Sequence, residues 1–466
     1  MMREEIGMSV KIIRASETGA KLDSDVTLGG GTDDTAVLQA VLDAAQDSGI
    51  HLIMDGAARI TGLKLYSNTT IECLNKRCGF YLADQTNGPL FRNAHPDFRV
   101  IRDENIRIIG GTYNHNCQNQ QHDIPIQESI YADMASDMDV FEGTHWPRGF
   151  YFFGVEGLSI SGITLRDQRT FGMLIANWKH VELRDILIDL PHHMDAQNQD
   201  GIHFWGPGQF LSMQNICGTA GDDFIALAPD EHDRKSAITD VYIDGVFLDA
   251  SDQGIRLLSR EKGRLDRVTI RNVTGTYKSF GFYIDAWFPG AYCGNFGNIR
   301  FENIDLRPLE PNYTYRSPFL FKVGGHIEHL TICNLQDHYS EHQRALIEVS
   351  GPICPAYTPP AEQAPTHIEE LTVDGLTIMQ KNESTVPAVV LDAAVDKVVL
   401  RNVDVRCGKK GTTALIHVGD HGDIGLLALN GVLTENVNRL IRDDNKAIDR
   451  TVMWNVCPDP NAAPGV

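Results

Sequence analysis

Two short acidic turns carry residue types that hydrolysis of a glycosidic bond requires. The first turn is Gln199-Asp200-Gly201 and the second is Gly221-Asp222-Asp223, 22 positions further by Asp200 to Asp222. In a chain that coils once in about 20 to 30 residues, this spacing stacks one turn on the other. Three carboxylates held close together repel, so at least one keeps its proton near neutral pH. A proton donor beside ionised carboxylates is an acid next to a base. We therefore predict that these three aspartates are catalytic.

The elements that position these turns come from a repeated segment. Its pattern is apolar, any, apolar, any, then Asn, Gly or Asp, then apolar, as in Val268-Thr-Ile-Arg-Asn-Val. Such segments begin at residues 106, 158, 181, 211, 241, 268, 299, 330, 371, 398 and 427. Alternation with period two predicts strands, and the Asn or Gly marks a bend. The fixed Leu/Asn pattern of leucine-rich repeats is missing. We predict an all-β chain, a single right-handed parallel β-helix of about ten or eleven coils, in which the stacked Asn residues are structural.

The segments around these repeats complete the predicted domain organisation. Residues 1–27 read as a lead-in and 28–466 as one β-helix domain. A helix from Asp33 to Asp47 has one apolar face and is placed to cap an exposed sheet edge. Insertions at about 116–148 and 351–367 interrupt the repeats. The first is the better candidate for a wall of the site or an oligomer contact.

A second set of strands aligns from coil to coil beside the acidic turns. Its members are Gly172-Met-Leu-Ile, Gly201-Ile-His-Phe, Asp223-Phe-Ile-Ala, Gly254-Ile-Arg-Leu and Gly281-Phe-Tyr-Ile. Alternation sends seven side chains into the core: Ile202, Phe204, Phe224, Ile255, Leu257, Phe282 and Ile284. The side chains that then project outward next to Asp223 are His203, Arg256, Tyr283 and Asp285. Trp178, Trp205 and Trp287 follow the same strands, where they could stack on sugar rings. We predict that His203, Arg256, Tyr283, Asp285 and Trp205 bind substrate.

These motifs carry a family resemblance. Gln199-Asp200-Gly201, Gly221-Asp222-Asp223-Phe-Ile-Ala-Leu and Asp252-Gln-Gly-Ile-Arg-Leu-Leu-Ser-Arg resemble the family 28 glycoside hydrolases, the polygalacturonase group. The Gly29-Gly-Gly-Thr-Asp-Asp-Thr helix start is similar to the wider pectate-lyase-like superfamily. The resemblance covers about residues 28 to 310. It implies that Asp222 is the general acid and that Asp200 and Asp223 together activate water for inversion. We expect no cofactor and no metal.

Two departures from the family pattern bear on the substrate. The chain lacks the Gly-His-Gly turn that follows the Asp-Asp pair in the family. It also has Arg256-Leu257-Leu258 where the family has Arg-Ile-Lys, whose Arg and Lys hold the uronate carboxylate. Loss of a cation from a carboxylate site costs uronate affinity. We therefore expect a short plant- or microbe-derived oligosaccharide with a neutral or differently placed acidic sugar, and not plain polygalacturonate.

Two alternative functions stay open for the same fold. One is a polysaccharide lyase, in which aspartates bind Ca²⁺ and Arg256 takes the proton in a β-elimination. The other is a non-catalytic, tailspike-like β-helix that binds glycan as a stable trimer. Ultraviolet absorbance of an unsaturated product would separate the lyase from a hydrolase, and turnover would separate both enzymes from the binding protein.

Charge and cysteine content limit the classes of partner and the cellular location that the sequence predicts. The 466 residues have a formal net charge of −21, which argues against nucleic acid as a partner. No run of 18 apolar residues is present and the first residues lack an apolar core, so we expect neither a membrane span nor a signal peptide. Nine cysteines without a zinc-binding spacing read as reduced thiols, which predicts a cytoplasmic location. A homo-oligomer is compatible with all of these features.

Overall fold

The computed structural model describes residues 10–121, 149–193, 198–231, 235–259, 263–286, 294–310, 318–337, 345–351, 365–383, 386–409 and 414–457. These residues form two compact units. The first comprises the described residues up to Gly221 without 205–208, and the second comprises 205–208 and the described residues from Asp222 onward. In both units the strands pair in parallel.

The strands of the first unit stack in three parallel ladders. The longest consists of β1 (Lys11–Arg14), β2 (Ile50–Met54), β5 (Thr69–Cys73), β9 (Arg107–Ile109), β11 (Phe150–Ser161) and β13 (Met173–Asp189). The second consists of β3 (Ala57–Ile60), β6 (Gly79–Leu82), β10 (Thr112–Asn114) and β12 (Thr164–Arg166). The third joins β4 (Leu63–Leu65) and β7 (Phe91–Asn93) to the start of β11. The remaining elements are β8 (Asp103–Glu104), which pairs with β11, β14 (Ile202–Gly218), and the 3-10 helices η1 (Ala15–Glu17) and η2 (Cys117–Asn119).

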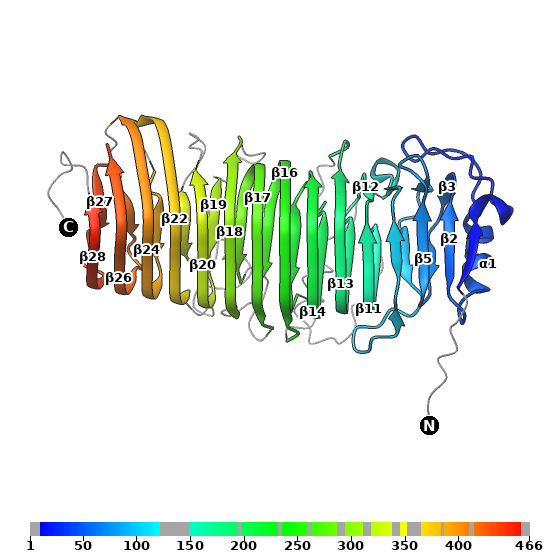
Figure 1. Cartoon of the computed structure of the whole chain (residues 1–466), viewed down its shortest axis with the longest axis horizontal. Helices are drawn as coiled ribbons and strands as arrows, with labels where there is room; N and C mark the ends of the chain where they lie inside the picture. The colour runs from blue at the N-terminus through cyan, green and yellow to red at the C-terminus, as the bar shows by residue number, and fades with distance from the viewer. Residues whose placement is uncertain are drawn as a thin grey trace, which may run out of the picture. The chain divides into compact units, whose positions relative to one another are not determined.

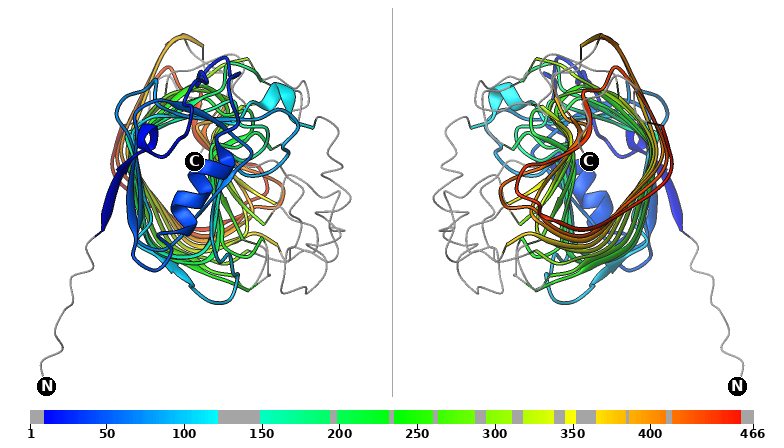
Figure 2. Two further views of the ribbon diagram at one scale, coloured as in Figure 1. Left: turned by 90° about the vertical axis from the view of Figure 1, so that its right-hand side faces the viewer. Right: turned by 90° about the vertical axis from the view of Figure 1, so that its left-hand side faces the viewer.

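One α-helix, α1 (Thr35–Asp43), lies across the end of the first coils (Figure 2). It buries Leu38 and Leu42, two members of the predicted apolar face. The helix is shorter than the predicted span from Asp33 to Asp47. Asp34 is its N-cap residue, and the Asp34 carboxylate accepts hydrogen bonds from the backbone N–H groups of Lys21 and Leu22. This carboxylate therefore binds the lead-in segment, which holds α1 against the first coils.

The strands of the second unit form two long ladders, whose parallel course Figure 1 shows. One ladder consists of β16 (Ile238–Leu258), β17 (Leu265–Asp285), β18 (Phe296–Pro308), β20 (His326–Asp337), β22 (His367–Glu383), β24 (Ala394–Lys409), β26 (Asp423–Glu435) and β28 (Ile448–Cys457). The other joins β15 (Asp223–Ala228) to the ends of β16 and β17, and continues through β19 (Phe319–Val323), β21 (Ala345–Ser350), β23 (Val389–Asp392), β25 (Ala414–Val418) and β27 (Arg439–Asp443).

The repeats recognised in the sequence occupy matching positions in these ladders. Val241 pairs with Val268, Val268 with Ile299 and Ile299 with Leu330. The stack continues from Leu330 through Leu371 and Val398 to Leu427. Each of these side chains is buried. In successive coils each aliphatic side chain packs on the next. This packing forms the core, and the apolar surface that it buries stabilises the stacked coils.

The bends of the repeats carry a ladder of asparagines, as predicted. Asn272, Asn303 and Asn334 all have positive φ angles, which Asn tolerates better than most residues. The side-chain amide of Asn303 donates to Asn272 at 2.9 Å, and that of Asn334 donates to Asn303 at 3.0 Å. In these contacts the asparagine side chains hydrogen-bond to one another from bend to bend. The ladder is therefore a structural feature.

The predicted fold class is confirmed: the chain is all-β, a right-handed parallel β-helix with an N-terminal capping helix. The assignment of 28–466 to one domain stays a prediction. Most of both predicted insertions, 122–148 and 352–364, lies outside the described residues. Seven described cysteines, Cys73 and Cys78 among them, are free thiols. In the described part of the chain, no helix has the length and apolar character needed to cross a membrane.

Candidate active site

The first acidic turn is fixed by contacts on the neighbouring coil. The backbone N–H of Gly172 donates to the carbonyl of Asp200 at 2.9 Å. The side-chain amide of Gln199 donates to the Gln168 carbonyl at 2.8 Å, and that of Gln168 donates to the Asp200 carbonyl at 3.4 Å. These hydrogen bonds therefore hold Asp200 just before β14, which begins at Ile202.

His203 lies against Asp200 and does not project into solvent. Its Nδ1 is 2.7 Å from Asp200 Oδ2, and both residues are only 3% exposed. The imidazole also stacks on the ring of Phe171, with 4.4 Å between centroids. The prediction of an outward His203 that meets substrate is therefore wrong in its exposure. The observed contacts hold the His203 ring between Phe171 and the Asp200 carboxylate.

The second acidic turn stacks on the first, as the 22-residue spacing predicted. The backbone N–H of Gly221 donates to the carbonyl of Gln199 at 3.0 Å, so the residues that precede Asp222 and Asp200 are neighbours. Asp222 is half-buried, whereas Asp223, the first residue of β15, is 4% exposed. The two aspartates of this turn therefore have different access to solvent.

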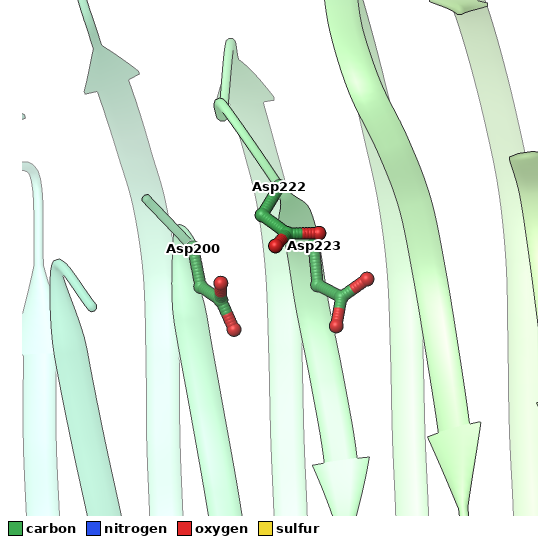
Figure 3. A group of neighbouring side chains, drawn as sticks. All are labelled: Asp200, Asp222 and Asp223. Carbon is green, nitrogen blue, oxygen red and sulfur yellow. The ribbon is translucent and has the colours of Figure 1, made fainter. Parts of the chain in front are cut away.

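Figure 3 shows the side chains of the three predicted catalytic aspartates. One carboxylate oxygen from each of Asp200, Asp222 and Asp223 lies within 4.8 Å of the other two. A metal ion could be held by a group of at least three Asp, Glu, His or Cys side chains that lie this close together. Among the described residues, these three aspartates are the one such group. Carboxylate oxygens are also ligands that Ca²⁺ accepts, so this donor set fits the chemistry of the lyase alternative as well.

Gln253 is a residue of this region that the sequence prediction missed. Its side-chain amide donates a short hydrogen bond to Asp222 Oδ1, and its backbone N–H donates to the Asp222 carbonyl at 3.2 Å. Gln253 belongs to the Asp252-Gln-Gly motif, which the sequence analysis used only as part of the family resemblance and not as a candidate site. Gln253 follows Asp222 by 31 positions, and the repeats in this part of the chain are spaced by 27 to 31 residues, so this spacing could have placed Gln253 one coil further on.

Arg256, Tyr283 and Asp285 form a connected polar group behind Asp223. Arg256 Nη1 lies 3.3 Å from Asp223 Oδ2, and its guanidinium lies over the Tyr283 ring at 4.8 Å from the centroid. The Tyr283 hydroxyl donates to Asp285 Oδ2 at 3.0 Å. The structure therefore brings all three predicted residues into one group.

The predicted solvent exposure of this group is wrong. Arg256, Tyr283 and Asp285 are 8%, 2% and 0% exposed. The reason is a second layer of packing on the outer face of the sheet, where Tyr283 clusters with Phe280, Phe319 and Ala345. Alternation correctly separates these side chains from the aliphatic core, but it does not predict what covers the outer face.

The predicted register of β15 is wrong by one residue. Asp223 pairs with Gln253, and Ile225 pairs with Ile255. The sequence alignment had instead placed Asp223 beside Gly254. Phe224 is nevertheless fully buried, as are Ile225 and Ala226, because the outer face of β15 is covered as well. A one-residue offset is hard to detect where both faces of a strand are apolar.

Trp205 is a buried packing residue, which corrects its prediction as a sugar platform. The indole Nε1–H donates to Glu231 Oε2 at 2.7 Å, and Trp205 is 3% exposed. Trp178 is 2% exposed and packs edge-on against Phe204. Neither ring has a free face for a sugar. The third tryptophan, Trp287, lies outside the described residues.

Lys322 is a second residue that the sequence prediction missed. It pairs in register with Tyr283, which itself pairs with Arg256, so a buried cation follows Arg256 two strands later. Lys322 Nζ donates to Ser350 Oγ and to the Gly351 carbonyl, and lies 3.6 Å from Glu348 Oε1. A lysine within the apolar segment Phe319-Leu-Phe-Lys-Val is the signal that could have found it.

Comparisons with known proteins show what the chain resembles in family and in fold. Residues 99–313 match the model of glycosyl hydrolases family 28, a span that includes every predicted site residue. A search of the curated proteins found no match. Solved structures with a similar fold include an exopolygalacturonase from Thermotoga maritima, with 13% identity, a TM-score of 0.50 and coverage of 95% of this chain and 91% of that chain.

Two further solved structures have comparable similarity. The N-terminal fragment of gene product 12 from bacteriophage phi29 has 12% identity and a TM-score of 0.51, over 93% of this chain and 73% of that chain. A family 28 exopolygalacturonase from Yersinia enterocolitica has 15% identity and a TM-score of 0.48, over 98% and 79%. At such identities the likeness concerns the fold, and the chemistry depends on the family match. The match over residues 99–313 places a glycosyl hydrolases family 28 region in the chain, which supports a glycosidase.

Proposed function

We propose that the protein hydrolyses a glycosidic bond of a plant- or microbe-derived oligosaccharide with inversion at the anomeric carbon. Asp222 protonates the leaving oxygen, and Asp200 and Asp223 together activate the attacking water. The observation that carries this proposal is the stacking of the two acidic turns through the hydrogen bond from Gly221 to Gln199. Stacked turns bring an acid and its partner bases to one place.

The neighbours of each carboxylate support this division of roles. Asp223 lies beside the guanidinium of Arg256, a cation that favours the ionised carboxylate. Asp200 lies beside the imidazole of His203. Asp222 instead accepts from the neutral amide of Gln253 and is the more exposed member of its turn. Its solvent access lets Asp222 reach the leaving oxygen of a bound sugar, whereas Asp200 and Asp223 are buried.

The cations near the acidic turns support a substrate other than plain polygalacturonate. Leu258 stands where the family has a lysine, and Lys322 is already engaged by Glu348 and Ser350. Arg256 is likewise paired with Asp223. A polymer with a carboxylate on every sugar requires unengaged cations to bind it. We therefore infer a neutral sugar, or an acidic sugar whose carboxylate lies elsewhere, at the cleaved bond.

The test is an oligosaccharide screen with the anomer of the product read by NMR, followed by Asp222→Asn. We expect this nearly isosteric change to lower kcat by about 10²- to 10⁴-fold, the usual contribution of a general acid. The Tm should stay nearly unchanged because Asp222 is half-buried. Asp47→Asn, at an exposed carboxylate after α1, is the matched control and should keep full activity. Full activity of the Asp222 variant on a cleaved substrate would refute the assignment.

The same screen separates the alternatives. A product that absorbs in the ultraviolet as an unsaturated uronide, and whose formation a chelator abolishes, would establish the lyase reaction. Binding without turnover by a stable trimer would establish the tailspike-like protein. The cytoplasmic location and the homo-oligomer stay predictions, to be checked by cell fractionation and by light scattering.

A further inference from the structure

The turn that precedes the first acidic turn is pinned to the neighbouring coil at His192. The backbone N–H of His192 and its ring Nδ1 both lie close to Asp167 Oδ1, at 3.3 and 3.0 Å. The Cys117 thiol donates to the His192 carbonyl at 3.4 Å. Burial raises the pKa of Asp167, while the contacts with His192 oppose that rise. These contacts hold the backbone on the N-terminal side of His193.

His193, the next residue, lies directly against Gly221 of the second acidic turn. A Cβ atom added to Gly221 would lie 2.8 Å from both Cδ2 and Nε2 of the His193 ring. The imidazole edge therefore occupies the space that glycine leaves at position 221. Asp222 is the next residue, with its Cα about 3.8 Å from that of Gly221. Unlike His203, which is buried, the His193 side chain is exposed to solvent.

We infer that His193 is a further substrate-contacting residue, whose imidazole binds a hydroxyl group of the sugar next to Asp222. This inference rests on the proposed function of the acidic turns. Each neutral imidazole has one N–H donor and one acceptor nitrogen, a combination that suits a sugar hydroxyl. With the Nε2 edge against Gly221, the opposite edge with Nδ1 faces away from the turn backbone. The glycine at 221 is thus required for close approach of this ring.

The first experiment compares His193→Ala and His193→Asn with wild type on the oligosaccharide that wild type cleaves. We expect the alanine variant to lose about tenfold in kcat/KM, the usual worth of one hydrogen bond to a neutral group. Asparagine, which retains a donor and an acceptor, should restore part of the loss. The Tm of both variants should match wild type because the side chain is exposed. The control is His421→Ala, which removes an exposed imidazole in the second unit and should leave activity unchanged.

A second experiment tests the contact with Gly221. Gly221→Ala should displace the imidazole and lower kcat/KM, and the same change in the His193→Ala background should cost less. Part of the cost remains in both backgrounds because the new Cβ would also lie 3.0 Å from the Cβ of Gln199. Equal costs in the two backgrounds would overturn the assignment of His193 to this turn.

Binding measurements separate failure of this inference from failure of the proposed function. The probes are the neutral, fully methyl-esterified form of trigalacturonate, which the inferred preference for a neutral sugar favours, and trigalacturonate itself, which has the same ring hydroxyls but carries charge. Calorimetry on Asp222→Asn with and without His193→Ala should show the same loss for both probes. Loss with the charged probe alone would overturn the hydroxyl contact in favour of a carboxylate contact. Equal affinity in both variants would overturn a binding role for His193 while leaving the hydrolase intact.

Two results complete the separation. Weaker binding by His193→Ala in a protein that cleaves no oligosaccharide would sustain the contact and refute the hydrolase. Absence of any binding by wild type, together with absence of cleavage, would overturn both.

Discussion

At the scale of single residues, Arg256 shows how a side chain on the outer face of a strand becomes part of the interior. Its guanidinium is held between the carboxylate of Asp223 and the ring of Tyr283, and it is 8% exposed. A buried cation with a carboxylate partner stabilises the folded state mainly because it balances the buried negative charge of that carboxylate. Arg256 therefore serves stability and the ionisation of Asp223 together.

The buried pair predicts the stability of Arg256 variants. Arg256→Ala leaves the Asp223 carboxylate without this cation and should lower the free energy of unfolding by about 3 kcal/mol. Asp223→Asn in the same chain should remove the unpaired charge, so that the double variant loses less than the sum of the two single losses. Urea titration measures all three. Arg450→Ala, at an exposed position of β28, is the control and should change stability by no more than about 0.5 kcal/mol.

A large loss of stability in Arg256→Ala would replace the sequence-based expectation that this residue is mainly a substrate contact. Additive losses in the double variant would instead show that Arg256 and Asp223 do not act as a pair. The identity of the acidic residues and the stacking of their turns were predictable, because type and spacing determine them. Burial was not, because the packing over Tyr283 involves Phe319 and Ala345, which belong to later strands of the chain.

At the scale of elements, the bends hold the coils in register through side chains that repeat. Asn303 both donates to Asn272 and accepts from Asn334, and its φ angle is 58°. Each asparagine in the ladder thus satisfies its neighbours and adopts a backbone conformation that is unfavourable for most residues. The repeat made this ladder predictable from the sequence.

Two variants of Asn303 separate these contributions. Asn303→Ala loses both hydrogen bonds and strains the backbone, so we expect stability to fall by about 2 kcal/mol. Asn303→Gly loses the same hydrogen bonds but adopts a positive φ freely, and should lose about 1 kcal/mol. Thermal and urea unfolding measure both. Equal losses would mean that the left-handed conformation contributes nothing.

The less regular elements were harder to predict. Helix α1 spans Thr35–Asp43, several residues shorter than the apolar pattern indicated. Its N-terminal end is set by Asp34, whose carboxylate binds the backbone of Lys21 and Leu22. That contact joins segments separated in sequence, and no local pattern reveals it. The offset of β15 has a similar origin, since the apolar residues that follow Asp223 fit two registers equally well.

At the scale of the whole molecule, the coils stack so that each strand depends on its neighbours in the ladder. In such repeat architectures stability is roughly the sum of each coil and its contacts with adjacent coils. In the second unit, β17 pairs in register with both β16 and β18, and its apolar side chains are buried. A strand of this kind opens only when the contacts on both of its sides are lost.

The C-terminal strand of the second unit is placed differently, and this difference predicts its dynamics. β28 pairs in register with β26, none of its residues is buried, and Trp454 is 55% exposed. Because local opening costs least where few apolar contacts are lost, hydrogen exchange followed by mass spectrometry should be fastest in peptides from Ile448–Cys457 and slowest in those from Leu265–Asp285. Val268→Ala, in the stacked core of β17, should speed exchange in β16 and β18 along with β17, whereas Val452→Ala in β28 should leave β17 unchanged. Protection in β28 equal to that in β17 would contradict additive stacking and would require that the strand be covered in solution.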